Sequence, residues 1–182
     1  MTRSFLPFPY PDDEFSNASK AIVYNGNIYK HPTEERYFYQ CLSGRYAYTF
    51  TLKDNRMENV SYLLNEPPVF QLGKDGTNVY MANETLFGGT CYVTGKYIYV
   101  KLENFTMGDF AEGTIEKRNE GYACWFNNEI KAFDWDGNPV RTYKFDRYLS
   151  NFVVDREDRF LYAMTKDVET DKDSLVKYEL KD

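Results

Sequence analysis

One stretch, residues 130–146, sets the strongest constraint on what this chain can fold into. Two runs of largely apolar residues, 130–135 and 140–145, flank the dipeptide Asp136-Gly137. Because aspartate and glycine tolerate a positive φ, this dipeptide suits the tight turn of a two-stranded hairpin. The apolar residues recur with a period of two, not 3.6. The stretch therefore predicts a β-hairpin, and it indicates the fold rather than a chemical function.

Two-residue alternation extends along most of the chain. Aromatic residues make up 18% of the sequence, with 17 Tyr and 14 Phe, and such side chains favour the half-buried surface of a sheet. The clearest strand is 96–102, where Tyr97 and Tyr99 should point to one face and Ile98 and Val100 to the other. No segment has a helical period. Further strands are expected at 20–29, as two pieces around a turn at Asn25-Gly26, and at 36–41, 46–52, 59–64, 90–93, 151–154, 160–164 and 175–180, with a brief strand near Val79.

A weak internal repeat groups these strands into three units. The triplets Tyr37-Phe38-Tyr39, Tyr97-Ile98-Tyr99 and Phe160-Leu161-Tyr162 lie 60 and 63 residues apart. Repeated sets of four antiparallel strands are typical of β-propeller blades, although common blades repeat every 40–50 residues or so. The long connections 65–81 and 103–127 can absorb the difference. We therefore predict an all-β fold of about three four-stranded antiparallel blades in one domain, 1–182, with blade-like units at 18–64, 86–146 and 149–182.

Several of these segments resemble a known family. The stretches IKAFDWDGNPVRTYKFD, FVVDREDRFLYAMTKDVETDKDSLVKYEL, GKYIYV and FLPFPYP look like those of bacterial TolB-like six-bladed β-propeller proteins, which are often exported lipoproteins. The resemblance extends over essentially the whole chain, and it is to the C-terminal half of such a protein. It implies half of a six-bladed ring and a location in the cell envelope or periplasm, and it supplies no catalytic residues.

The N-terminal segment gives a different indication of location. Residues 1–15 contain three prolines and an acidic run but no apolar core, so they do not resemble a signal peptide. As written, the chain is expected to be cytoplasmic.

An isolated half-ring would leave open faces and unpaired strand edges in water, which is unfavourable. The third unit offers only three strands, and residues 4–9 are the candidate for its fourth. Two copies related by a two-fold axis would give six blades, with residues 4–9 of each copy completing the last blade of the other. The sequence thus predicts a homodimer; the alternative is a fragment that folds as an open arc.

Composition excludes some partners. The formal net charge is −6 and no basic block interrupts it, so the phosphate neutralisation that nucleic-acid binding needs has no source. No apolar run approaches the roughly 20 residues of a membrane-spanning helix, so no membrane span is expected. Cys41, Cys91 and Cys124 lack the paired spacing of metal or redox sites. We expect them to be free thiols, buried or partly buried.

Two acidic turns are candidate cation sites. Residues 134–138 begin like a calcium loop, but Pro139 and Phe145 stand where that loop needs glycine and glutamate. This stretch is interpreted as a turn. The cluster Asp155, Glu157 and Asp158 could gather a cation, but an acidic hairpin tip is more often simply solvated. We expect no metal and no cofactor.

The sequence offers no convincing catalytic group. His31 is the only histidine, which excludes a two-histidine metal site, and no G-x-S-x-G motif accompanies it. We interpret His31 as structural. Hydrolysis by paired carboxylates remains open, because the separation of two carboxylates cannot be read from sequence. The favoured function is therefore a non-enzymatic binding scaffold, and the alternative is a propeller hydrolase or lactonase that uses carboxylates and a divalent cation.

The candidate binding residues are Tyr122, Trp125 and Phe126 in the long insertion. Rigid amphipathic rings make good contact surfaces for a protein, peptide or carbohydrate ligand. The alternative is that these rings pack against the outer edge of a blade.

Overall fold

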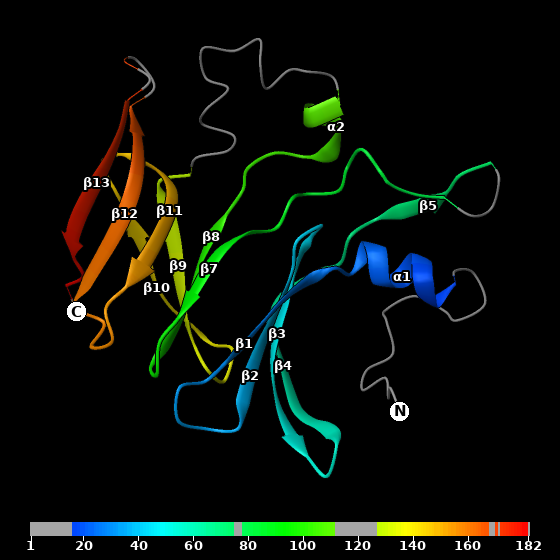
Figure 1. The fold of residues 1–182 in the computed structure, drawn as a ribbon, viewed down its shortest axis with the longest axis horizontal. Helices are drawn as coiled ribbons and strands as arrows, with labels where there is room; N and C mark the ends of the chain where they lie inside the picture. The colour runs from blue at the N-terminus through cyan, green and yellow to red at the C-terminus, as the bar shows by residue number, and fades with distance from the viewer. Residues whose placement is uncertain (1–15, 75–77, 112–126, 168–169, 171, 182) are drawn as a thin grey trace.

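The computed structural model describes residues 16–74, 78–111, 127–167, 170 and 172–181. These residues form three antiparallel sheets of three or four strands that stand side by side, and a separate two-stranded sheet (Figure 1). Sheet 1 contains β1 (Gly26–Lys30), β2 (Arg36–Cys41), β3 (Arg45–Lys53) and β4 (Arg56–Glu66); sheet 2 contains β7 (Gly89–Val93), β8 (Tyr97–Leu102), β9 (Glu129–Asp134) and β10 (Pro139–Lys144); sheet 3 contains β11 (Tyr148–Val154), β12 (Phe160–Asp167) and β13 (Lys172–Glu179). Each sheet is an up-and-down meander of strands in chain order. The predicted all-β, propeller-like architecture is confirmed.

Sheet 2 lies between the other two because both of its faces are apolar. Ile98 and Val100 pack toward Phe38 of sheet 1 in one buried cluster. Tyr99, from the opposite face of β8, packs with Leu161 of sheet 3 in another. All of these side chains are at most 1% exposed. The alternation predicted for 96–102 is confirmed, and it is what lets one sheet join two cores.

The outer face of sheet 1 is partly covered by two small elements. These are α1 (Asn17–Val23) and the hairpin of β5 (Phe70–Leu72) and β6 (Val79–Met81). Tyr24, directly after α1, contacts Tyr46 of β3 and Phe70 of β5 edge to face, with ring centroids 5.9 and 6.4 Å apart. A third buried cluster therefore forms on the side of sheet 1 that faces away from sheet 2.

The expectation of no helix is wrong at two places. The first strand piece predicted within 20–29 is α1, which begins after Ser16, whose Oγ accepts a hydrogen bond from Ser19 N at 3.1 Å. Such a cap satisfies one of the free amides of the first turn. The second helix, α2 (Met107–Ala111), lies in the long insertion. It begins with a reciprocal pair, in which Thr106 Oγ1 accepts from Asp109 N and the Asp109 carboxylate accepts from Thr106 N.

The remaining strand predictions agree with the structure to within a few residues. Residues 36–41 have the predicted bounds, and the predicted strand near Val79 is β6, paired with β5. Cys41 and Cys91 are buried free thiols, as expected. Cys124 and the candidate strand 4–9 lie outside the described residues. Within the described part, no helix is both long and apolar enough to cross a membrane.

Gly26 is required by a close approach of two strands rather than by the predicted tight turn. A Cβ at this position would lie 2.2 Å from Gln40 O, whereas one at Gly95 would meet nothing within 4 Å. Replacing Gly26 with alanine is expected to lower the free energy of unfolding by about 2 kcal/mol or more, because backbone must shift to admit the methyl group. Urea denaturation followed by circular dichroism measures the loss. The matched change Gly95→Ala should cost less than about 0.5 kcal/mol, and equal losses would contradict this explanation.

Candidate functional site

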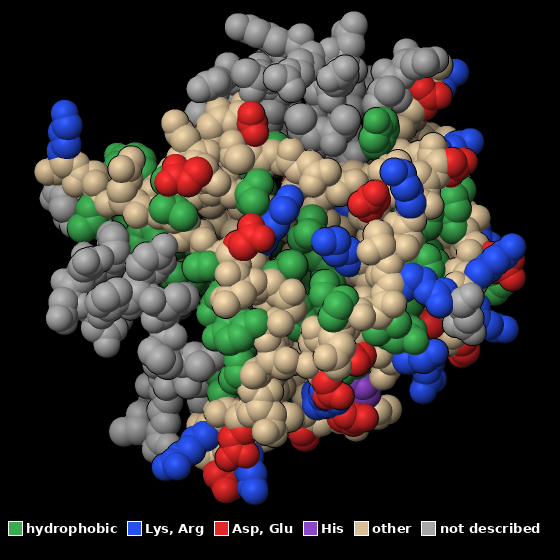
Figure 2. Space-filling model, turned by 180° about the vertical axis from the view of Figure 1, so that it is seen from behind, with side chains coloured by type: hydrophobic (Ala, Val, Ile, Leu, Met, Phe, Trp, Pro, Cys, Tyr) green, Lys and Arg blue, Asp and Glu red, His purple; other side chains and the backbone are tan. Residues whose placement is uncertain are grey.

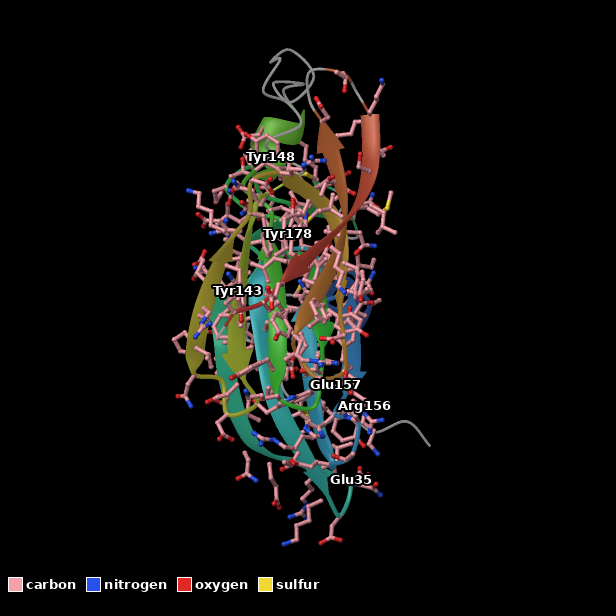
Figure 3. The ribbon with its side chains drawn as sticks, turned by 90° about the vertical axis from the view of Figure 1, so that its left-hand side faces the viewer. Glu35, Tyr143, Tyr148, Arg156, Glu157 and Tyr178 are labelled. Atoms are coloured by element: carbon pink, nitrogen blue, oxygen red, sulfur yellow. The ribbon has the colours of Figure 1, made fainter. Side chains whose placement is uncertain are left out.

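The turns that follow the first strand of each sheet lie at one end of the molecule. In the side view, Glu35 of the β1–β2 turn and Arg156 and Glu157 of the β11–β12 turn lie toward the same end, whereas Tyr148 lies at the other (Figure 3). The β7–β8 turn, residues 94–96, belongs to this end as well, because its backbone contacts the first of these turns. We call these turns, together with the β9–β10 turn, the turn cluster.

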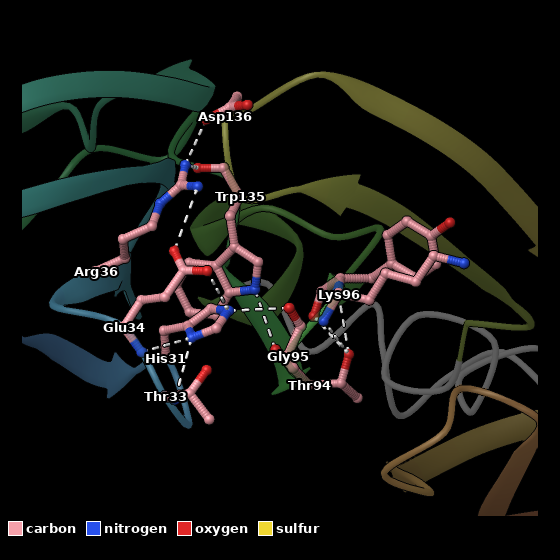
Figure 4. Close-up of polar contacts among 10 residues, drawn as sticks. His31, Thr33, Glu34, Arg36, Thr94, Gly95, Lys96, Trp135 and Asp136 are labelled. Carbon is pink, nitrogen blue, oxygen red and sulfur yellow. Dashed lines mark hydrogen bonds and ion pairs between the residues drawn. The ribbon is translucent and has the colours of Figure 1, made fainter.

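His31 joins the turns of sheets 1 and 2. Its Nδ1 accepts hydrogen bonds from the backbone N–H groups of Thr33 and Glu34, at 3.2 and 3.0 Å. Its Nε2 therefore donates to Gly95 O, at 2.9 Å. The imidazole also meets the indole of Trp135 edge to face, with centroids 4.7 Å apart (Figure 4). Every polar atom of this buried ring is used to hold the two turns together, which confirms the structural interpretation of His31.

Asp158 makes the equivalent connection between sheets 2 and 3. Its Oδ1 accepts a hydrogen bond from Thr94 Oγ1 at 2.7 Å and another from the Tyr99 hydroxyl at 2.9 Å. Burial of the Tyr99 hydroxyl, and next its hydrogen bond to this carboxylate, raise the pKa of Tyr99 well above its usual value. Asp158 itself adopts a φ of 57°, which aspartate tolerates better than most residues. The carboxylate considered above as a cation ligand thus links two sheets.

The other turn carboxylates are also used by their own backbone. Asp134 Oδ1 accepts hydrogen bonds from the N–H groups of Asp136 and Asn138, both at 2.9 Å. Partial burial acts to raise the pKa of Asp134, but the hydrogen bonds from Asn138 and from the turn backbone outweigh it and hold this pKa below its usual value. In the next sheet, Asp155 Oδ1 accepts from Arg159 N and Phe160 N. Residues 134–138 form a turn, as interpreted from the sequence. The Asp155 and Asp158 carboxylates differ from the expected solvated tip, because both accept hydrogen bonds from the protein.

The hydrolase alternative gains no support from these contacts. In the described ranges, no group of three or more His, Cys, Asp or Glu side chains gathers in a way that could hold a metal ion. The carboxylates of Asp134, Asp155 and Asp158 instead accept hydrogen bonds from backbone amides or hydroxyls and so stabilise the turns.

A hollow of about 500 Å³ opens beside the turn cluster, between strands β3 and β4 of sheet 1 and the β9–β10 turn of sheet 2. The turn is fixed to sheet 1 from two sides. Arg36 donates to the backbone O of Trp135 and, at 2.5 Å, to the carboxylate of Asp136. Ser61 Oγ donates to Asp136 O at 2.6 Å. Gly137 closes the turn with a φ of 90°, as the sequence predicts, and a Cβ there would lie 2.6 Å from Ser61 Oγ.

A bulge shapes the sheet 1 wall of this hollow. The register of β3 against β4 shifts between Thr49 and Thr51, so Asn59 is not part of a regular pair and takes a φ of 53°. Bulges commonly redirect a side chain. Here the amide Nδ2 of Asn59 donates to Thr51 Oγ1 at 3.1 Å, and both residues line the hollow.

Two sheet faces carry apolar rows that are partly exposed. On the outer face of sheet 1, the register aligns Ile28, Tyr39, Tyr48 and Tyr62 across four strands. The two ends of this row, Ile28 and Tyr62, are 65% and 45% exposed. Seen from behind, where the sheets are viewed along their edges, other hydrophobic side chains reach the surface in the middle of the molecule (Figure 2).

The outer face of sheet 3 is the second such surface. Met164 of β12 and Leu175 of β13 are register partners on it, and Val153 of β11 lies on the same face. These three side chains are 41%, 72% and 47% exposed. Lys177 lies over the ring of Phe160, with Nζ 3.6 Å from the centroid. We call the two surfaces the sheet 1 face and the sheet 3 face.

The candidate binding residues Tyr122, Trp125 and Phe126 lie outside the described residues. Sequence reasoning did not single out Arg36, Asn59 or Thr49 as lining a hollow, because no local pattern indicates that β4 bulges toward a turn of another sheet. The one signal available was Asp136-Gly137, which was singled out as a turn and forms the opposite wall.

Comparison with known proteins supports this architecture. A family model described as TolB-like 6-blade propeller-like matches residues 6–157. The chain belongs to this family. None of the curated proteins searched matches it significantly.

Solved structures similar to this TolB-like chain show 10–11% sequence identity. One is a provisionally assigned 6-phosphogluconolactonase from Bacteroides fragilis, with 10% identity and a TM-score of 0.41 over 87% of this chain and 40% of that one. Another is the WD40 domain of Pan2 from Neurospora crassa, with 11% identity and a TM-score of 0.31 over 84% of this chain and 49% of that one. This chain therefore spans less than half the length of either structure.

Proposed function

We propose that the chain is a non-enzymatic propeller scaffold that binds other protein through its two outer sheet faces, and that a second copy of the chain is the partner. The observation that carries this proposal is the pair of exposed apolar rows, one on the sheet 1 face and one on the sheet 3 face. Where sheets 1 and 2 pack against each other, the facing side chains are almost fully buried. A further sheet would cover the two outer faces in the same way.

The energetics favour covering both faces. Burial of apolar surface contributes about 25 cal/mol per Å², and large exposed apolar patches are typical of interaction surfaces. A two-fold axis would place the sheet 1 face of each copy on the sheet 3 face of the other, so that both faces of both copies are buried. Three sheets in each chain then give the six of the family description.

The two faces also match in chemistry. The sheet 1 face presents Tyr62, with Tyr39 and Tyr48 half-buried beside it, and the sheet 3 face presents Lys177, which lies over the ring of Phe160. A lysine over a tyrosine ring makes a favourable cation–π contact. The prediction that residues 4–9 of one copy complete the last sheet of the other is part of the same proposal.

The assembly is tested by light scattering of the full chain at micromolar concentration, where a dimer is expected. Leu175→Glu on the sheet 3 face should weaken dimerisation by about tenfold or more, since it brings an unpaired charge into the contact. Val140→Glu is the control, because Val140 is also an exposed apolar residue, at 45%, on β10 of sheet 2, away from both faces. A monomeric parent chain, or equal effects of the two variants, would contradict the proposal.

A further inference from the structure

We propose that the hollow between sheet 1 and the β9–β10 turn is a binding site for a small neutral sugar, of one or two rings. The site is distinct from the two outer sheet faces, and it does not depend on dimerisation. Its volume, about 500 Å³, lies within the roughly 300–1,000 Å³ of small-molecule pockets.

The first observation is a hydroxyl that reaches the hollow and has no protein partner. Thr49 is 2% exposed and lines the hollow, and its Oγ1 makes no hydrogen bond to any residue that the structure describes. This oxygen is not among the buried side-chain atoms that lack a partner, so it is open to the hollow and available to a ligand. A ligand hydroxyl in the hollow would supply the missing bond.

The second observation is the set of groups around that hydroxyl. Thr51 and Ser61 add hydroxyl oxygens whose protons are bonded to Glu58 O and Asp136 O, and Asn59 adds an amide whose carbonyl oxygen has no partner among the described residues. The oxygens of these two hydroxyls and of the amide can each accept a hydrogen bond from a ligand. Such a wall matches a ligand that itself carries several hydroxyls. Phe50, Val60 and Trp135 also line the hollow and supply apolar surface for the C–H groups of a sugar ring.

The third observation is the charge balance, which selects a neutral ligand. Arg36 and Asp136 are the charged residues of the lining, and they pair with each other at 2.5 Å. An anionic ligand would have to compete with the Asp136 carboxylate for the guanidinium, and a cationic ligand would have to compete with the guanidinium for the carboxylate. A neutral sugar can accept from Arg36 and donate to Asp136 without separating the pair.

The test is a titration of the full chain, followed by NMR chemical shifts and calorimetry. The probes are glucose, galactose, mannose, maltose and lactose, with gluconate and glucose 6-phosphate as the anionic comparison. We expect at least one neutral sugar to bind, with shift changes at the hollow. Asn59→Gly keeps the positive φ but removes the amide, and Thr49→Val removes the hydroxyl. Each should weaken binding by about tenfold, the effect of one good hydrogen bond.

Matched controls separate binding from folding. Asn55 also has a positive φ, 59°, in the exposed β3–β4 turn outside the hollow, so Asn55→Gly should bind as the parent does. Thr142→Val, on the exposed strand β10, is the matched control for Thr49→Val and should also bind as the parent does. Binding of none of the neutral sugars, unchanged binding by both hollow variants, or a preference for the anionic probes would overturn the proposal.

Discussion

Replacing Trp135 with alanine is expected to lower the free energy of unfolding by about 3–5 kcal/mol, the usual cost of removing a large buried aromatic side chain. Trp135 is 4% exposed and packs in the cluster shared by sheets 1 and 2. Its Nε1 donates to Thr94 O at 3.0 Å, and its ring supports His31. The substitution would therefore remove packing from the core and release both turns that the indole holds.

Denaturant unfolding of three variants measures these contributions separately. Trp135→Phe keeps most of the packing but leaves Thr94 O without its donor, so an intermediate loss of about 1–3 kcal/mol is expected. Val140→Ala, on the exposed side of the same hairpin, should change stability by less than about 0.5 kcal/mol. If Trp135→Ala lost no more than Val140→Ala, the indole would not be a main connection between sheets 1 and 2.

The strands could be predicted because their signal is local. In β2 and β8, successive side chains point to opposite faces of the sheet, and both faces are apolar or aromatic. A few residues are therefore enough to reveal the two-residue period. The Asp136-Gly137 turn is equally local, since it depends on the φ that its own residues tolerate. The all-β class followed from local patterns of this kind, and the propeller prediction also needed their repetition along the chain.

The helix α1 could not be predicted by the same reasoning. Seven residues make about two turns, too few for a 3.6-residue period to stand out. Its formation depends on the Ser16 cap and on the burial of Val23 and Tyr24 against sheet 1 and β5. Only the first of these is visible in sequence, and a lone serine is a weak signal.

The hollow was beyond sequence reasoning for a related reason. Arg36 and Asp136 are 100 residues apart in the chain, and they meet because sheets 1 and 2 pack face to face. The alternation of 59–64 predicted a plain strand, whereas the bulge places Asn59 outside the regular pairing. A site between a turn of one sheet and a bulge of another arises only when the two sheets pack together. No single sequence segment therefore predicts it.

Raising the pH above 10 is expected to destabilise the protein steeply, with Tyr99 as a main contributor. Its side chain is fully buried, and burial together with the Asp158 hydrogen bond raises its pKa well above 10. The pKa values of Tyr39 and Tyr46 are raised as well, chiefly by burial. In the unfolded chain these hydroxyls lose their protons near pH 10. Because the folded state keeps them, their contribution is complete below pH 10 and falls as the pH rises further.

Each such tyrosine should lower the free energy of unfolding by about 1.4 kcal/mol per pH unit above 10. Tyr99→Phe removes one of these groups, so its stability should fall less steeply than that of the parent between pH 10 and 11.5, although it starts lower through loss of the Asp158 bond. Tyr80→Phe, at a 54% exposed position, should follow the parent. Urea denaturation at a series of pH values gives the three slopes. Parallel curves of stability against pH for Tyr99→Phe and the parent would contradict this prediction, because they would mean that Tyr99 has the same pKa in the folded and unfolded states.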